Sequence, residues 1–144
     1  MAHTVMRVDV VDSEEQIFSG EAEYLVAPAT EGEVGIYPRH IPLITKLKPG
    51  VLRLQVPGHA HQLVFAISGG FLEVQNNHAT ILADVVERTD ALDVQRLNEQ
   101  KTIAEAKIKR SDSSSTAELA KAHAALEIAI AQLKAVEYIK KHPK

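Results

Sequence analysis

Residues 62–84, QLVFAISGGFLEVQNNHATILAD, contain three short apolar runs separated by two groups of turn residues. The runs QLVFAIS, FLEVQ and ATILAD cluster or alternate apolar side chains, which is typical of β-strands. The groups SGG (68–70) and NN (76–77) suit tight turns, because glycine and asparagine tolerate positive φ. The stretch therefore predicts consecutive strands joined by tight turns.

The same pattern extends back to residue 4. The runs TVMRVDVV, AEYLVAPA and VLRLQV are also strand-like, and Ser-Gly (19–20), Pro-Gly (49–50) and Pro-Gly (57–58) lie between such runs. Short strands with turns at intervals of about eight to twelve residues are typical of an antiparallel sandwich or barrel. We therefore expect residues 1–88 to form an antiparallel β domain, and the pattern alone leaves both architectures open.

Residues 89–144 have a different composition, and we expect them to form an antiparallel two-helix hairpin. No glycine occurs after Arg88, and good helix formers such as alanine, leucine, glutamate, lysine and glutamine dominate. The polar break SDSSS (111–115) predicts one helix over residues 90–110 and a second over 116–141. Ser115 and Glu118 have the spacing of a capping box, in which each side chain bonds the other residue's backbone amide.

The second predicted helix has more than one apolar stripe. Leu119, Leu126 and Ile130 mark one face, Ile128 and Ile139 mark another, and alanine fills 8 of the 23 positions from 117 to 139. This pattern favours a helix that packs on both the first helix and the β domain. The alternative is that the small side chains fit a groove on another protein.

Composition and charge restrict the classes of function. The chain is 45% apolar and 24% charged with a net charge of −3, which gives no electrostatic case for binding nucleic acid. Residues 1–88 carry six basic and eleven acidic side chains, whereas residues 89–144 carry ten and eight. The hairpin is therefore mildly basic and suits an acidic partner. We expect a cytosolic chain, because it has no cysteine, no long apolar run and no leader pattern at its start.

The search for catalytic or metal-binding residues gives no complete set. His59 and His61 are close in sequence but follow a Pro-Gly turn without a third ligand nearby, which favours a solvated turn over a metal site. The serines lack a nucleophile-elbow context, and the glycines at 32 and 35 belong to no phosphate-binding loop. We therefore expect neither an enzyme nor a metal protein.

Residues 31–45, EGEVGIYPRHIPLIT, combine two glycines and two prolines with two acids, an arginine and a histidine. Proline fixes φ and glycine permits close backbone approach, so the stretch can form a rigid corner that presents polar side chains. The residues expected to shape the corner or fill the core are Gly35, Pro38, Pro42, Ile36, Ile41, Leu43 and Ile44. The polar residues that such a corner can present include Glu33, Arg39 and His40.

This stretch, followed by LKPGVL, ISGGFLEV, ATILAD and ALDVQR, resembles the epsilon subunit of F-type ATP synthases along essentially the whole chain. The resemblance implies a β-sandwich of about ten strands (residues 1–88) and a C-terminal hairpin (residues 89–144). It also implies a non-catalytic central-stalk subunit that couples rotation of the c ring to the gamma shaft. Such a subunit is peripheral, lies on the cytoplasmic face of the bacterial plasma membrane, and does not insert into the membrane.

The resemblance also assigns contact residues and regulation. Glu33, Arg39 and His40 correspond to the loop that faces the c ring. The resemblance implies that the hairpin contacts the beta and alpha subunits of the catalytic head and inhibits ATP hydrolysis. The basic residues expected to make those contacts are Lys134, Lys140 and Lys141.

Some family members bind ATP through a motif at the start of the first helix and arginines on the second. Leu92, Asp93 and Arg96 match that motif, but Leu97 replaces its alanine. Two uncharged residues, Ile128 and Gln132, align with the arginines, and this removes the charge-assisted bonds that would hold a triphosphate. We therefore predict weak or no ATP binding and no other cofactor.

A second hypothesis from another class remains open at this point. Composition and periodicity are also compatible with a free-standing β-sandwich that binds a ligand and self-associates through its helical hairpin. Complex formation with a gamma subunit would separate the two.

Overall fold

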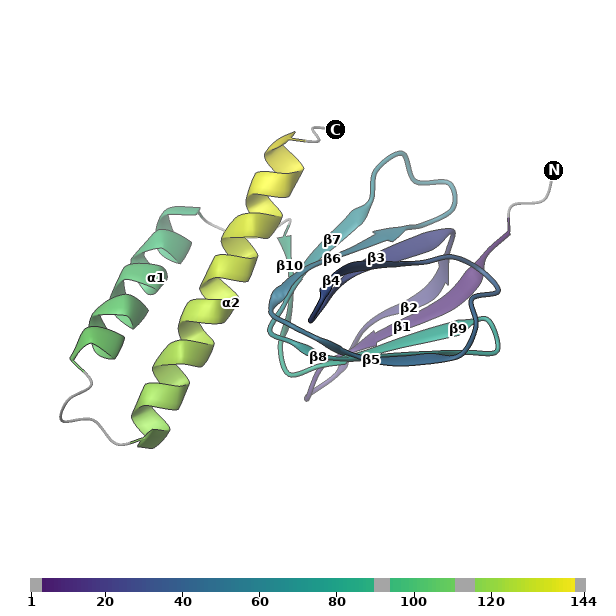
Figure 1. Ribbon diagram of the computed structural model, residues 1–144. Coiled ribbons are helices and arrows are strands. Elements are labelled where there is room, and N and C mark those ends of the chain that lie inside the picture. The colour runs from purple at the N-terminus through teal and green to yellow at the C-terminus, as the bar shows by residue number, and fades with distance from the viewer. Residues whose placement is uncertain (1–3, 90–93, 111–115, 142–144) are drawn as a thin grey trace.

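The computed structural model describes residues 4–89, 94–110 and 116–141. Figure 1 shows a β-sandwich with two antiparallel helices against one side. This arrangement confirms the predicted sandwich followed by a helical hairpin. The strands are β1 (Met6–Val11), β2 (Gln16–Ala22), β3 (Tyr24–Ala29), β4 (Gly32–Ile36), β5 (Leu43–Leu47), β6 (Gly50–Gln55), β7 (Leu63–Ile67), β8 (Gly70–Gln75), β9 (His78–Ala83) and β10 (Val86–Arg88).

The strands form two layers. Hydrogen bonds run in the order β10-β7-β6-β3 in one layer, with β4 on β3, and β5-β8-β9-β1-β2 in the other. A short pairing of Ala29 in β3 with Leu47 in β5 joins the layers. The pairs are antiparallel except for β1 and β9, which are parallel. These two strands lie far apart in the chain, so no hairpin forces them to run in opposite directions.

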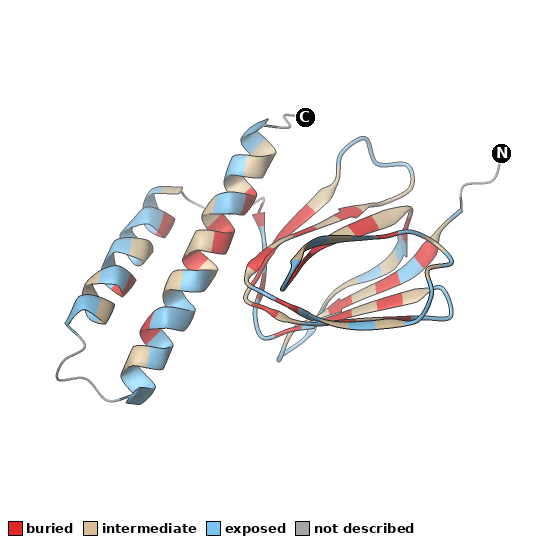
Figure 2. Ribbon diagram, in the orientation of Figure 1, coloured by how far each residue is buried: buried red, intermediate tan, exposed pale blue. Residues whose placement is uncertain are grey.

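The sandwich core follows from the period-two pattern of the strands. In β1, Met6, Val8 and Val10 point inward and are fully or almost fully buried, whereas the residues between them are more exposed. Leu52 and Leu54 of β6 repeat this alternation. Figure 2 shows buried positions, in red, recurring along the strands of both layers. Alternating side chains on facing strands therefore build the core.

Strand β7 departs from the alternation, because both of its faces are covered. Phe65 and Ile67 belong to the sandwich core, whereas Val64 and Ala66 pack against the second helix. This explains why a run of apolar residues occurs here instead of alternation.

The helices are α1 (Val94–Lys109) and α2 (Thr116–Lys141), and α2 lies between α1 and the sandwich (Figure 1). Ala131 and Ala135 of α2 are buried against β7, and the buried Ala122 of α2 lines a groove shared with α1. This confirms that the second helix packs on two neighbours. The predicted start of the first helix, residues 90–93, and the capping residue Ser115 lie outside the described residues.

Candidate interaction surfaces

Residues 31–45 form strand β4, a turn and the first part of strand β5. Gly32 opens β4 with φ of 129°, a value that side chains rarely adopt. Strand β4 hydrogen-bonds to β3 and lies off the main path of the sheet, so it is an edge strand. Glu33 points to the exposed side of this strand, with 55% of its side-chain surface accessible.

The turn after β4 holds Arg39 in a left-handed conformation. The His40 amide donates to the Tyr37 carbonyl over 3.2 Å, and between them Pro38 is followed by Arg39 with φ of 68°. This is the pattern of a type II turn, in which the third residue is ordinarily glycine or asparagine. A side chain in this conformation costs about 1–2 kcal/mol. Arg39 thus occupies a position that favours glycine or asparagine.

A second turn in the same chain provides the comparison. The His59 amide donates to the Val56 carbonyl over 3.2 Å, and the intervening residues are Pro57 and Gly58, with φ of 80° at the glycine. Here the turn contains the residue that its geometry favours. This confirms that His59 lies in a turn.

Asn77 fixes the Arg39 turn to the rest of the sandwich. Its side-chain oxygen accepts a hydrogen bond from the Arg39 amide over 2.9 Å, and its amide nitrogen donates to the Val5 carbonyl over 2.9 Å. Asn77 itself has φ of 60° in the turn between β8 and β9. The Asn-Asn pair predicted this turn, but no pattern in the sequence indicated that the Asn77 side chain bonds to a segment 38 residues away.

The expectation that four apolar residues of this stretch fill the core is wrong for two of them. Ile36 is fully buried and Leu43 packs against the core, but Ile41 and Ile44 are each 74% exposed. Ile44 follows the inward-facing Leu43 in β5 and therefore points to the opposite face of the sheet. Ile41 lies between the turn and β5, where no facing layer covers it.

An apolar patch lies on the outer face of the layer opposite the hairpin. Phe71 of β8 pairs directly with Leu82 of β9, and both are about half exposed. Ile44 of β5 lies on the neighbouring strand. Exposed apolar groups that gather on one face indicate a contact surface for another protein. We call Ile44, Phe71 and Leu82 the apolar face.

Glu33 also has a partner within the chain. Its carboxylate lies 3.2 Å from a terminal nitrogen of Arg53 on β6. The Arg53 guanidinium lies in turn over the ring of Tyr138 on α2, 4.7 Å from the ring centre. Sequence analysis missed both Arg53 and Tyr138, because the pairing crosses from β4 over β3 to β6 and then to the hairpin.

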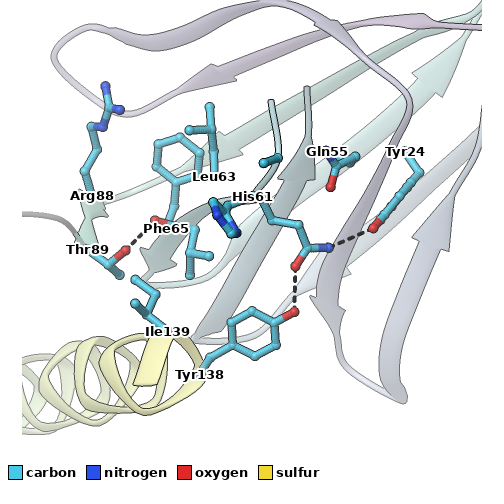
Figure 3. Close-up of a pocket in the computed structure, with 12 residues that line it drawn as sticks. Tyr24, Gln55, His61, Leu63, Phe65, Arg88, Thr89, Tyr138 and Ile139 are labelled. Carbon is cyan, nitrogen blue, oxygen red and sulfur yellow. Dashed lines mark hydrogen bonds between the residues drawn. The ribbon is translucent and has the colours of Figure 1, made fainter. Parts of the chain in front are cut away.

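A cavity of about 560 Å³ lies where the hairpin meets the sandwich (Figure 3). Its polar lining is largely bonded to itself. The Tyr138 hydroxyl donates to Gln62 over 2.6 Å, and the Gln62 amide donates to the Tyr24 hydroxyl over 3.0 Å. The hydroxyl of Thr89, just after β10, donates to the Val64 carbonyl over 2.9 Å. The cavity is thus the junction of the two structural parts.

The three lysines predicted to meet the catalytic head are exposed near the end of α2. Lys141 forms an ion pair with Glu137 over 3.0 Å, and Lys134 and Lys140 point to solvent. Nearer the other end of the hairpin, a groove of about 770 Å³ runs between the helices, with Ile103 and Leu119 in its lining. Three cationic residues also line it: Lys107, Arg110 and Lys121.

The predicted nucleotide motif is described only in part. Leu92 and Asp93 lie outside the described residues, and Arg96 is exposed in the first turn of α1. Of the two positions that replace the arginines, Ile128 lines the interhelical groove and Gln132 is buried. The expectation of weak ATP binding remains a prediction.

A cluster around Asp9 joins three strands on the outside of the sandwich. The Asp9 carboxylate accepts hydrogen bonds from Ser19 over 2.6 Å and Gln16 over 3.1 Å, and it lies 2.5 Å from the His78 ring. The Ser19 bond, followed by contacts with His78 and Arg7, lowers the pKa of Asp9 despite partial burial. Because β2, β1 and β9 each contribute a member, the cluster stabilises the sheet.

Two further observations concern residues 4–89, 94–110 and 116–141. No three histidine, aspartate or glutamate side chains among them gather closely enough to bind a metal ion. No described helix is long and apolar enough to cross a membrane.

The fold and these surfaces define a class of protein: a β-sandwich with an appended helical hairpin that offers contact surfaces to other proteins. Residues 5–89 match the family described as "ATP synthase, Delta/Epsilon chain, beta-sandwich domain". The chain is 56% identical over 137 residues to the ATP synthase epsilon chain of Chromobacterium violaceum, covering 94% of this chain and 96% of that one. It is 49% identical to the ATP synthase epsilon chain of Neisseria meningitidis serogroup C, covering 98% and 99%.

Solved structures share the fold. A chain in the Euglena gracilis mitochondrial ATP synthase OSCP/F1/c-ring structure matches with a TM-score of 0.73 and 23% identity, over 90% of this chain and 79% of that one. A chain in the Tetrahymena thermophila central stalk/c-ring structure matches with a TM-score of 0.56 and 14% identity, over 94% and 99%. The chain belongs to the ATP synthase delta/epsilon family and is a non-catalytic subunit. This confirms the resemblance and decides against a free-standing ligand-binding module.

Proposed function

We propose that this chain is the epsilon-type subunit of the central stalk of an F-type ATP synthase. The observation that carries the proposal is the match with ATP synthase epsilon chains over almost the full length of both proteins. In this role the chain couples rotation of the c ring to the gamma subunit during proton-driven ATP synthesis. It works as a peripheral subunit on the cytoplasmic face of the bacterial plasma membrane, with residues 1–88 and 89–144 as its two functional parts.

The surface that carries Glu33, Arg39 and His40 is the proposed contact with the c ring. The strained backbone of Arg39 and its bond to Asn77 support this assignment, because together they present polar groups from a fixed turn. The apolar face is the proposed contact with gamma. It lies on the layer that the hairpin leaves uncovered, and large exposed apolar side chains are enriched where proteins associate.

The hairpin is the proposed restraint on ATP hydrolysis. Lys134, Lys140 and Lys141 are exposed on α2 and available to acidic segments of the catalytic beta and alpha subunits. Each exposed ion pair contributes only about 0–1 kcal/mol, so we expect inhibition to depend on the set of lysines rather than on one.

Complex formation tests the central-stalk role. Purified chain mixed with the gamma subunit should elute as a stoichiometric complex in size-exclusion chromatography. Replacement of Phe71 and Leu82 by serine should weaken that complex, whereas replacement of the exposed Ile103 on α1 should leave it intact. Absence of a complex with the wild-type chain would refute the role.

Enzyme assays test the other two surfaces. Removal of residues 90–144 should raise the ATPase activity of the reconstituted enzyme without preventing assembly, and unchanged activity would contradict the restraint. Charge reversal at Glu33 combined with replacement of His40 should reduce ATP-driven proton pumping, and normal pumping would remove the c-ring assignment.

A calorimetric titration of the chain with ATP tests the prediction of weak or no binding. Micromolar affinity would contradict it.

A further inference from the structure

The Glu33 surface is connected to the hairpin by two independent routes that meet at Tyr138. In the first route, the Glu33 carboxylate pairs with Arg53, and the Arg53 guanidinium lies over the Tyr138 ring. In the second route, Tyr37 stacks on Tyr24 with ring centres 5.4 Å apart. We call the six residues the Tyr138 network: Glu33, Tyr37, Tyr24, Arg53, Gln62 and Tyr138.

The second route is completed by hydrogen bonds. Gln62 donates to the Tyr24 hydroxyl and accepts from the Tyr138 hydroxyl, as the dashed lines in Figure 3 show. Glu33 and Tyr37, both within residues 31–45, are therefore each connected to Tyr138 of α2 by a series of side-chain contacts on the sandwich.

Arg53 is the sensitive member of the network. Its side chain is only 18% exposed, and its Nε is buried without a hydrogen-bond partner in the described structure. Within the described residues, the Glu33 carboxylate and the Tyr138 ring lie against its charge. A partly buried cation that loses one of two such partners is less stable where it stands.

The hairpin is held to the sandwich by a small contact. Its buried cluster consists of Val64, Ala66, Ala131 and Ala135, and three of these are alanine. Val51, Tyr138 and Ile139 pack at the edge of the cluster. Because the cluster is small, the contacts of Tyr138 form a substantial part of what holds α2 in place.

We propose that the Tyr138 network couples occupancy of the Glu33 surface to docking of the hairpin. A cationic group of a partner that engages Glu33 leaves Arg53 without its carboxylate, and the Arg53–Tyr138 contact weakens. The coupling is reciprocal: release of the hairpin exposes Arg53 to water, which loosens its hold on Glu33 and favours the partner. This inference rests on the proposed function for the identity of the partner, but its internal step needs no partner.

The internal step can be measured in the isolated full-length chain. The only tyrosines of the chain are Tyr24, Tyr37 and Tyr138, so labelling with 3-fluorotyrosine gives three ¹⁹F NMR signals, assignable by single Tyr→Phe variants. In Glu33→Gln we expect the Tyr138 signal to shift and amide hydrogen exchange over residues 131–139 to accelerate roughly fivefold. The matched control is Glu31→Gln, an exposed acid two residues away, and we expect it to change neither readout.

The variant Arg53→Met tests the first route, from Glu33 through Arg53 to Tyr138. In Arg53→Met the Glu33→Gln change should have no further effect on Tyr138 or on exchange, because the intermediate residue is gone. Tyr138→Phe keeps the ring over Arg53 but removes the hydroxyl bond to Gln62, so it should shift the Tyr24 signal. It carries no fluorine label at 138, and the exchange over residues 131–139 should still accelerate when Glu33→Gln is added. Unchanged signals and exchange in Glu33→Gln, or an equal response in Arg53→Met, would overturn the proposal.

The partner is tested separately. Size-exclusion chromatography with gamma and the c ring reports on the proposed function, and the NMR and exchange data report on the coupling. A response to Glu33→Gln without complex formation would refute the central-stalk role and leave the coupling standing. Complex formation with no response would refute the coupling alone.

Discussion

Replacement of Gly70 by alanine should destabilise the sandwich more than the same replacement at a turn glycine where no atom lies near the added Cβ. Gly70 begins β8 between two strands, pairing with Leu47 of β5 and Ala83 of β9. Its φ is 145°, and an added Cβ would lie 1.9 Å from the Leu82 carbonyl oxygen and 2.8 Å from the Ala83 Cα. Both atoms belong to the backbone of β9, so neither can move without breaking the ladder.

The expected loss of stability in Gly70→Ala can be worked out by comparison with Gly58. That residue has φ of 80° and nothing within 4 Å of an added Cβ, so Gly58→Ala carries the conformational cost of about 1–2 kcal/mol alone. Gly70→Ala adds the backbone clash, and we expect a total loss of at least about 3–4 kcal/mol.

The stability of both variants can be measured by urea denaturation, with unfolding monitored by circular dichroism. A urea m-value of about 1–3 kcal/mol per M places the midpoint of Gly70→Ala about 1 M or more below that of Gly58→Ala. Failure of Gly70→Ala to refold under conditions where Gly58→Ala refolds would agree with the same reasoning. Equal midpoints would show that β9 can retreat from the added methyl group and would refute it.

Three further predictions concern the turn, the Asp9 cluster and the docked helix. Arg39→Gly should leave the free energy of unfolding unchanged or raise it by up to about 1 kcal/mol, since relief of the left-handed strain exceeds the added chain entropy; any measurable loss of stability in urea titrations would contradict this. The lowered pKa of Asp9 means that its stabilisation is present above its ordinary value of 3.8 and is lost as pH falls through the folded-state value. The stability gap between wild type and Asp9→Asn should therefore exist at about pH 6 and shrink below 3.8, and a constant gap in urea midpoints would refute the assignment. Ala135→Leu places a larger side chain in a fully buried contact, which should lower the free energy of unfolding by about 1–3 kcal/mol and accelerate hydrogen exchange in β7 and α2. The same change at the exposed Ala124 should do neither.

Local patterns predicted the elements of this fold because the forces that form them are local. Alternation in MRVDVV fixes which side chains of β1 face the core, and the loss of glycine after Arg88 marks the helical part. The same alternation also contained the correction for Ile44. In LITKL, Leu43 and Leu47 share the inner face, so period two places Ile44 and Lys46 outside.

The connections between distant elements could not be predicted in this way. Arg53 pairs with Glu33 across an intervening strand and contacts Tyr138 from 85 positions further along the chain. No periodicity encodes such a contact, because it depends on the order of strands in the sheet and on the face that α2 covers. Asn77 is similar: its turn was predictable, but its bond to the Arg39 amide was not.

The alanine content of α2 connects the structure of the hairpin to its proposed role. A helix packed on two neighbours needs small side chains at the contacts, and Ala131 and Ala135 allow close approach to β7. Burial of one methyl group contributes only about 0.8 kcal/mol, so these contacts define a position while adding little stability. Specific polar contacts must then contribute much of the preference for the docked state. Tyr138 supplies them, through a ring over Arg53 and a hydroxyl on Gln62. Because both contacts lead to the surface that carries Glu33 and Tyr37, the strength of docking depends on what that surface binds.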